Sequence, residues 1–277
     1  MLNILENYDL VTMGHNSPTY AALLTELMKY AYADRSKYLG DPDFFDVPVQ
    51  SLISKEYAKN IYKKIKLNSI TPSEKILPGS ELKHESLDTT HFSVADMNGN
   101  FVSNTYTLNS GFGSGVIVDG TGVLMNNEMD DFVSAPGVPN QFGLVGGEAN
   151  KIEPFKRPLS SMTPTIVLKD KKPYLILGTP GGSTIITTVF QNILNVVVHN
   201  MNIKESVDAP RFHSQWLPDQ IDYEKNSLSE KTINELIGLG HKLEQRGYIG
   251  EANGIMINDD MYWGGADKRG ENTAIGY

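Results

Sequence analysis

The stretch Asp88-Thr89-Thr90-His91-Phe92-Ser93-Val94 stands where a polar linker gives way to sequence with the alternation of β-strands. The preceding residues 67–88 are broken by proline, glycine and serine, which is typical of an exposed segment that can be cut without loss of the fold. The hypothesis to be tested is that the chain cleaves itself between Asp88 and Thr89, so that Thr89 becomes a new N-terminus.

An N-terminal threonine carries both a nucleophile and its base. A hydroxyl is a weak nucleophile until a base removes its proton, and the freed α-amine has an unperturbed pKa of about 7.7–8.0, close to working pH. Taken without context, two threonines at the start of a strand more often reflect β-propensity than catalysis. Both interpretations of Thr89 are open at this point.

The residues after Thr89 predict a hairpin. Strands from Thr90 to Met97 and from Phe101 to Leu108 flank Asn98-Gly99, a strong short-range hairpin signal. Pairing two strands of similar length brings the start of the first beside the end of the second. Thr107 or Asn109 is therefore expected near Thr89, where either could orient its hydroxyl.

A second hairpin, Thr165 to Leu168 and Pro173 to Leu177, leads into Gly178-Thr179-Pro180-Gly181-Gly182-Ser183 and then into an apolar helix ending near Val197. The N-terminus of a helix attracts anions, because its first N–H groups lack intrahelical partners and its dipole is positive there. Gly181 and Gly182 could thus hold an oxyanion. They could equally form a tight turn that binds nothing.

The rest of the chain predicts helices and one more hairpin. Residues 1–66 are expected to be helical, with a helix from Pro18 to near Tyr38 and another over Glu56–Lys66. Ser227 and Glu230 suggest a capping box for a helix that reaches Ile237. A final hairpin is expected around Asp259-Asp260.

Composition excludes several classes of function. The 277 residues include 24 Lys and Arg against 33 Asp and Glu, a net charge of −9, which argues against nucleic-acid or anionic-membrane partners. The lack of cysteine excludes a thiol nucleophile and disulfides. Six histidines show no paired metal-ligand spacing, so no metal site and no cofactor are expected. We also expect no export signal and no membrane helix.

Several long motifs occur in a distinctive order and resemble the bacterial γ-glutamyltranspeptidases. They are Asp88 to Val94, Thr105-Tyr106-Thr107-Leu108-Asn109, Leu124 to Phe132, Gly143-Leu144-Val145-Gly146-Gly147, Lys156-Arg157-Pro158-Leu159-Ser160-Ser161-Met162 and Pro180-Gly181-Gly182-Ser183. The segment Ala31 to Phe44 resembles the end of that family's large subunit, and the later motifs resemble its small subunit.

The resemblance implies an α+β N-terminal-nucleophile hydrolase with αββα layers, made as a precursor (zymogen) that cleaves itself. The family transfers the γ-glutamyl group of glutathione, or of other γ-glutamyl compounds, to water or to an acceptor amino acid or peptide. Matched position by position, Thr89 would be the nucleophile, Thr107 its hydroxyl partner, and Gly181 and Gly182 the oxyanion hole. Two further sets of residues would bind the donor. Its α-amine would be bound by Asn109, Glu128 and Asp131, and its α-carboxylate would be bound by Ser160 and Ser161.

The resemblance also implies how the chain is divided. Residues 1–88 would be the C-terminal part of the large-subunit region with its linker, and residues 89–277 the small, catalytic subunit region, the two associating after cleavage. The family has a longer N-terminal region, so the layers are expected to be incomplete at the N-terminus, and a separately encoded N-terminal region is one candidate partner. A periplasmic or secreted location is implied. The alternative is a truncated, inactive relative that acts at most as a binding or interaction protein.

Overall fold

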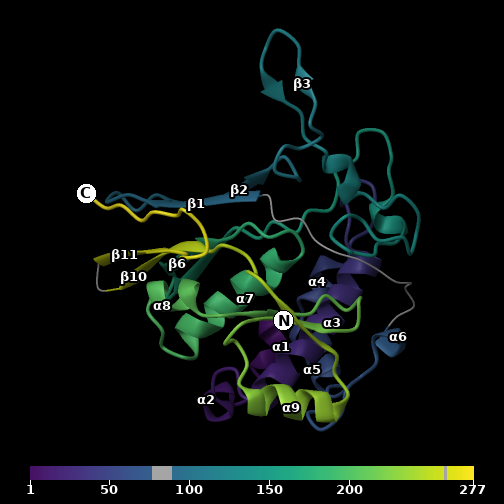
Figure 1. Cartoon of the computed structure of the whole chain (residues 1–277), viewed down its shortest axis with the longest axis vertical. Coiled ribbons are helices and arrows are strands. Elements are labelled where there is room, and N and C mark those ends of the chain that lie inside the picture. The colour runs from purple at the N-terminus through teal and green to yellow at the C-terminus, as the bar shows by residue number, and fades with distance from the viewer. Residues whose placement is uncertain (77–88, 259–260) are drawn as a thin grey trace. The chain divides into compact units, whose positions relative to one another are not determined.

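A computed structural model describes residues 1–76, 89–258 and 261–277, which form two compact units (Figure 1). The first unit is built from residues 1–85, 129–160 and 212–246, and the second from residues 86–128, 161–211 and 247–277. Asp88, most of the predicted linker and the turn Asp259-Asp260 lie outside the described residues.

The first unit is mainly helical and is built around one long helix, α3 (Pro18–Tyr38). The Ser17 side chain accepts a hydrogen bond from the amide of Tyr20, and Pro18 occupies the first turn, as predicted. Leu23, Leu24 and Leu27 are fully buried. The other elements are α1 (Leu2–Leu5), α2 (Leu10–Met13), α4 (Val49–Leu52), α5 (Lys55–Tyr62), α6 (Ser73–Ile76), α9 (Glu230–Leu239), η2 (Glu148–Asn150), β7 (Phe212–His213), β8 (Ile221–Glu224) and β9 (Leu243–Arg246).

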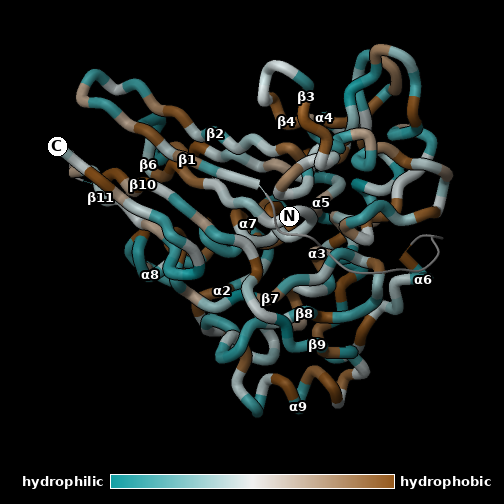
Figure 2. Tube along the Cα trace, turned by 45° about the horizontal axis from the view of Figure 1, so that its top comes forward, coloured by the Kyte–Doolittle hydropathy of each residue, from teal (hydrophilic) through white to brown (hydrophobic). Residues whose placement is uncertain are grey.

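Two predictions about these helices are wrong in detail. The cap of α9 is Ser229, whose side chain accepts from the amide of Thr232, whereas the Ser227 hydroxyl donates to the Glu224 carbonyl after β8. Ser229 can cap because its backbone is extended directly before the helix. α5 ends at Tyr62 rather than at Lys66. α9 ends at Leu239, two residues beyond the predicted Ile237, and Gly240 directly after it adopts the left-handed conformation. Along α9, short hydrophilic and hydrophobic stretches follow one another (Figure 2).

In its described residues, the second unit contains three sheets and two helices. A four-stranded antiparallel sheet has the order β11 (Met261–Ala266), β10 (Asn253–Asn258), β6 (Lys172–Gly178) and β5 (Thr165–Lys169). The hairpin β1 (Thr89–Ala95) and β2 (Phe101–Thr107) forms a separate sheet, and β3 (Ile117–Val118) pairs with β4 (Val123–Leu124). The helices are α7 (Thr184–Val197) and α8 (Ile203–Asp208). The described residues confirm the two predicted hairpins β1–β2 and β5–β6, and they confirm that β10 and β11, the strands of the third, pair antiparallel.

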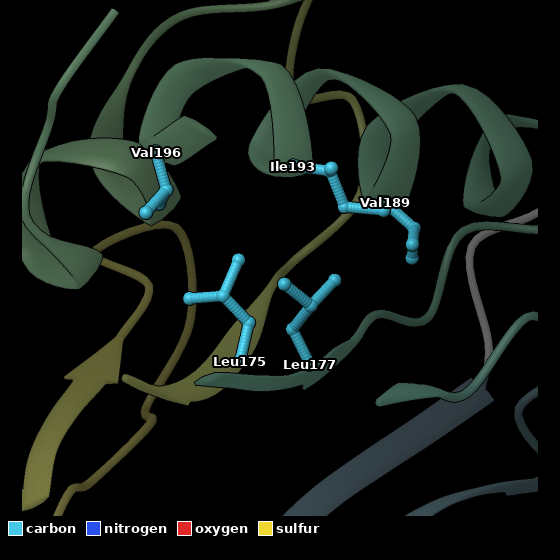
Figure 3. Packing of buried hydrophobic residues seen from close by; sticks show 5 residues of the cluster. All are labelled: Leu175, Leu177, Val189, Ile193 and Val196. Atoms are coloured by element: carbon cyan, nitrogen blue, oxygen red, sulfur yellow. The ribbon is translucent and has the colours of Figure 1, made fainter. Parts of the chain in front are cut away.

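The helix α7 packs on one face of the four-stranded sheet. Leu175 and Leu177 of β6 point toward Val189, Ile193 and Val196 of α7, and all five side chains are buried (Figure 3). Because β6 alternates with a period of two, its other face is free to meet a second sheet.

The hairpin β1–β2 packs on that other face of β6 (Figure 1). A Cβ atom placed on Gly178 would lie 2.3 Å from the ring of His91, so only glycine permits this approach. The Ser103 hydroxyl donates to the Leu177 carbonyl at 3.0 Å. The second unit therefore has the order helix, sheet, sheet, which corresponds to three successive layers of the predicted αββα arrangement.

Within the described ranges, no helix is both long enough and apolar enough to cross a lipid bilayer.

Candidate active site

The register of β1 and β2 places Thr89 directly opposite Thr107. Their Oγ1 atoms are 3.3 Å apart, which is hydrogen-bonding distance. Both side chains are half-buried. The predicted juxtaposition of Thr89 and Thr107 is confirmed.

The end of β2 is tied to the acidic segment. The Thr107 Oγ1 atom accepts a hydrogen bond from the amide of Asn109 at 2.8 Å. Asn109 is buried, has a positive φ of 77°, and donates from Nδ2 to the carbonyl of Asn127 at 3.1 Å. Thr107 and Asn109, both predicted to lie near Thr89, thus belong to one hydrogen-bonded chain that reaches the residue before Glu128.

An open pocket of about 310 Å³ lies against Thr89 and Thr107. Its other lining residues are Thr90, Tyr106, Leu108, Ser110 and Gly111. The predicted nucleophile, Thr89, is therefore one of the residues that line an open pocket.

The turn at Gly181 and Gly182 requires glycine at the first position for steric reasons. Their φ angles are +138° and +54°, values that favour glycine. A Cβ on Gly181 would lie 2.6 Å from Thr184 Oγ1 and 3.2 Å from Gly250 Cα. The turn opens α7, so its backbone amides lie at the N-terminus of a 14-residue helix. Backbone amides at such a helix N-terminus can bind an anion, and the oxyanion hole at Gly181 and Gly182 stays a prediction.

The predicted substrate-binding residues are divided between the units. Glu128 and Ser161 belong to the second unit, together with Thr89, Thr107, Asn109, Gly181 and Gly182, whereas Asp131 and Ser160 belong to the first. Glu128 and Asp131 are the two ends of the short helix η1 (Glu128–Asp131).

In the first unit, the buried Arg35 of α3 interacts electrostatically with Asp131. Burial lowers the pKa of Arg35, and the negative charge of Asp131 opposes this shift. Reasoning from the sequence placed Arg35 in a matching motif but assigned it no role. Nothing in the local pattern indicates that position 35 meets position 131.

The segment before Ser160 is held by an ion pair. Arg157 donates from Nε and Nη2 to the buried carboxylate of Asp41 at 2.9 and 2.5 Å, and its backbone amide donates to the same group. This bidentate geometry is the strongest form of an arginine–carboxylate contact. Arg157 holds the pKa of Asp41 well below its usual range.

His91 is a buried, hydrogen-bonded residue of the hairpin that was not singled out from the sequence. Its Nδ1 is 2.8 Å from Thr105 Oγ1, and its Nε2 is 3.0 Å from Ser93 Oγ. Burial lowers the pKa of His91 to about 4, so the ring is neutral at pH 7. The alternation of β1 could have shown that His91 shares a face with Thr89.

His213 is buried, and its Nε2 is 3.0 Å from Gln215 Oε1. Over residues 1–76, 89–258 and 261–277, no group of three or more His, Asp or Glu side chains is arranged to hold a metal ion.

Comparison with known proteins identifies the family. The family model for gamma-glutamyltranspeptidase matches residues 1–277. The chain belongs to the gamma-glutamyltranspeptidase family.

Individual relatives agree with this assignment. The glutathione hydrolase proenzyme of Escherichia coli is 49% identical over 279 residues, which cover 100% of this chain and 48% of that protein. The crystal structure of a Helicobacter pylori gamma-glutamyltranspeptidase mutant is 51% identical, covers 65% of this chain and 100% of that chain, and has a TM-score of 0.64. A cephalosporin acylase from Bacillus halodurans is 25% identical over 98% of this chain and 47% of that chain, with a TM-score of 0.80.

These similarities establish an α+β N-terminal-nucleophile hydrolase fold. The chain spans about half the length of the curated relatives that it matches, 48% and 50% for two of them.

Proposed function

We propose that the chain is the catalytic part of a γ-glutamyltranspeptidase that cleaves itself before Thr89 and then transfers γ-glutamyl groups. The observation that carries this proposal is the 3.3 Å contact between the Oγ1 atoms of Thr89 and Thr107 beside an open pocket. A hydroxyl pair in which one member can polarise the other is the arrangement that an activated threonine nucleophile needs.

Self-cleavage would begin with attack of Thr89 Oγ1 on the carbonyl carbon of Asp88. The bond between that carbon and the Thr89 nitrogen breaks, the nitrogen takes up a proton, and an ester joins Asp88 to the threonine oxygen. Water then hydrolyses this ester and leaves a carboxylate on Asp88 and a free amine on Thr89. Thr107 would hydrogen-bond the attacking oxygen.

Turnover would use the new amine as the base. The Thr89 hydroxyl attacks the γ-carbonyl carbon of the donor, its proton passes through the α-amine to the leaving amine, and a γ-glutamyl ester forms on Thr89. Water or an acceptor amino acid or peptide then takes the acyl group. The amides of Gly181 and Gly182 would stabilise the oxyanion in both steps.

The head group of the donor would be recognised by charge and hydrogen bonds. Asn109, Glu128 and Asp131 would receive the α-ammonium group, since carboxylates attract a cation. Ser160 and Ser161 would donate hydrogen bonds to the α-carboxylate. Glutathione carries this head group, as do other γ-glutamyl compounds.

The two products, 1–88 and 89–277, would remain associated. The first unit already contains residues from both sides of the proposed cleavage point. Lys29 is fully buried and lies 2.9 Å from Asp219, and the Ser73 hydroxyl donates to the Trp216 carbonyl at 2.6 Å. These contacts, together with Asp41–Arg157, would join the products without a peptide bond. A separately encoded N-terminal region is a further candidate partner.

Intact-mass measurement tests the proposal. Wild type should give fragments 1–88 and 89–277, whereas Thr89→Ala should stay whole and show no hydrolysis of a γ-glutamyl anilide. Thr121→Ala, a change of an exposed threonine between β3 and β4, is the control and should behave as wild type. Uncleaved wild-type protein would overturn the proposal and favour the alternative of an inactive binding protein.

A further inference from the structure

The short helix η2 carries a buried asparagine, Asn150, that links two separate segments of the first unit. Its side chain is 5% exposed. Its Nδ2 donates to the carbonyl of Asp131 at 2.7 Å, and its Oδ1 accepts from the amide of Leu159 at 3.0 Å. Asp131 is the proposed ammonium-binding residue, and Leu159 directly precedes Ser160, which is proposed to bind the carboxylate.

The orientation of the Asn150 amide follows from its partners. The carbonyl of Asp131 can only accept a hydrogen bond, and the amide of Leu159 can only donate one. The nitrogen of the side chain must therefore face Asp131 and the oxygen must face Leu159. Asparagine meets both needs at short reach, whereas aspartate would place an acceptor against the Asp131 carbonyl.

The backbone around Asn150 is fixed by further contacts. The amide of Val133 donates to the Asn150 carbonyl at 2.9 Å. A Cβ on Gly40 would lie 2.1 Å from the Ala149 carbonyl oxygen, so η2 rests directly on the segment that follows α3. The Asp41–Arg157 ion pair fixes the other end of the segment that leads to Ser160. Asn150 is thus a rigid spacer rather than a flexible surface contact.

The chemistry of the donor makes this spacing matter. The ammonium and carboxylate groups of an α-amino acid are attached to the same carbon, so the groups that receive them must be close together and held at a fixed separation. One planar carboxamide spans the gap between the two receiving segments. A shift at either end would misplace one receptor relative to the other.

We propose that Asn150 is a positioning residue that sets the spacing between Asp131 and Ser160 and thereby makes the site selective for an α-amino-acid head group. The inference rests on the proposed function, because it takes the roles of Asp131 and Ser160 from it. Asn150 itself touches neither the donor nor the reacting atoms.

Substrate selectivity tests the role of Asn150. Three anilides are compared: the γ-glutamyl compound, the glutaryl compound that lacks the amine, and the 4-aminobutyryl compound that lacks the carboxylate. Asn150→Asp keeps the acceptor for Leu159 but loses the donor to Asp131. It should lower the preference for γ-glutamyl over glutaryl in kcat/KM by about tenfold, and change the preference over 4-aminobutyryl by less than about twofold. Asn150→Ala should lower both preferences.

Amide hydrogen exchange gives a readout that does not depend on activity. Asn150→Ala should speed exchange at Leu159, while the amide of Val133, which donates to the Asn150 main chain, should stay protected. Asn150→Asp should leave Leu159 protected. Asn16→Asp is the matched control, because Asn16 Nδ2 likewise donates to a main-chain carbonyl, that of Ser227, at 2.9 Å, and it should leave all selectivities unchanged.

The outcomes separate the two proposals. If wild type hydrolyses the glutaryl and γ-glutamyl anilides equally well, the proposed donor site fails and the inference fails with it. If wild type discriminates and both Asn150 variants discriminate equally well, only the inference is overturned. A uniform loss of kcat/KM for all three substrates would also overturn it, because it would indicate a merely structural role.

Discussion

The hairpin that holds Thr89 and the segments around Asn150 are built in opposite ways. Thr89 and Thr107 are 18 residues apart and meet through the register of two adjacent strands. The region around Asn150 depends on contacts between residues far apart in the sequence. One of them is the ion pair of Asp41 and Arg157, which are 116 residues apart. The comparison indicates that local pairing places the proposed nucleophile, whereas tertiary contacts shape the proposed head-group receptor. Damage to one should leave the other intact.

Removing the Thr107 hydroxyl from the hairpin should have the largest effect on self-cleavage and turnover. Thr107→Val keeps a β-branched strand residue but removes the partner of Thr89 Oγ1, so self-cleavage and turnover should both fall by roughly 100-fold or more. The fraction cleaved over time and kcat are the measurements. Thr107→Ser restores a hydroxyl and should recover most of both rates. A Thr107→Val protein that cleaves at the wild-type rate would remove Thr107 from the mechanism.

Gly178→Ala should damage the packing of the hairpin on β6. The added methyl would overlap the His91 ring, and overpacking of this kind costs about 1–3 kcal/mol. Urea unfolding measures the loss. Replacing His91 by alanine in the same chain removes the overlap, so the double variant should lose less stability than the sum of the two single changes. Strict additivity would show that the ring and Gly178 do not meet.

The buried His91 should also make the hairpin sensitive to acid. Its folded pKa of about 4 lies below the unfolded value of about 6.5, so the unfolded chain binds more protons between these values. Stability should therefore fall as pH drops from about 6.5 toward 4, by about 1 kcal/mol at pH 5.5 from this group.

His91→Gln isolates that contribution. The pKa of His241 is also lowered to about 4, mainly by burial, so His241 contributes to the loss of stability in the same pH window. The variant should keep the His241 contribution, lose that of His91 and show a shallower loss of stability. Parallel curves for the two proteins between pH 6.5 and 4 would contradict a neutral, buried His91.

On the head-group side, Arg157→Lys should have the smallest effect. Lysine keeps the charge but loses the bidentate contact with Asp41, so the segment leading to Ser160 should loosen and KM for a γ-glutamyl anilide should rise a few-fold. The self-cleavage rate should stay at the wild-type value.

The effect of Arg157→Lys on KM should be constant above the ordinary carboxylate pKa of about 3.9. Arg157 lowers the pKa of Asp41 in the folded chain, so the pair is fully charged above that value and is lost only as pH falls through the lower folded pKa. A change in cleavage rate, or an unchanged KM, would refute the separation of the two regions.

Features of this fold that depend on short-range rules could be predicted from the order of the amino acids. The Asn98-Gly99 signal predicted the hairpin, and the alternation of the strands predicted which side chains share a face. The register that pairs Thr89 with Thr107 comes from a longer turn, in which the amide of Asp96 donates to the Asn100 carbonyl. The Ser17-Pro18 start of α3, the left-handed Gly240 and the glycine turn before α7 follow from backbone chemistry in the same way. Family motifs then supplied the candidate roles.

Only the tertiary structure revealed the contacts between distant segments. No local pattern distinguishes Asn150 from a surface asparagine. Nothing in the sequence around Gly178 indicates that the ring of His91, 178 − 91 = 87 positions earlier, packs against it. The sequence likewise did not predict the ion pair of Asp41 with Arg157 or the electrostatic interaction of Arg35 with Asp131. Periodicity and turn signals report on neighbours within a few residues, whereas these contacts exist only once the chain has folded and buried them.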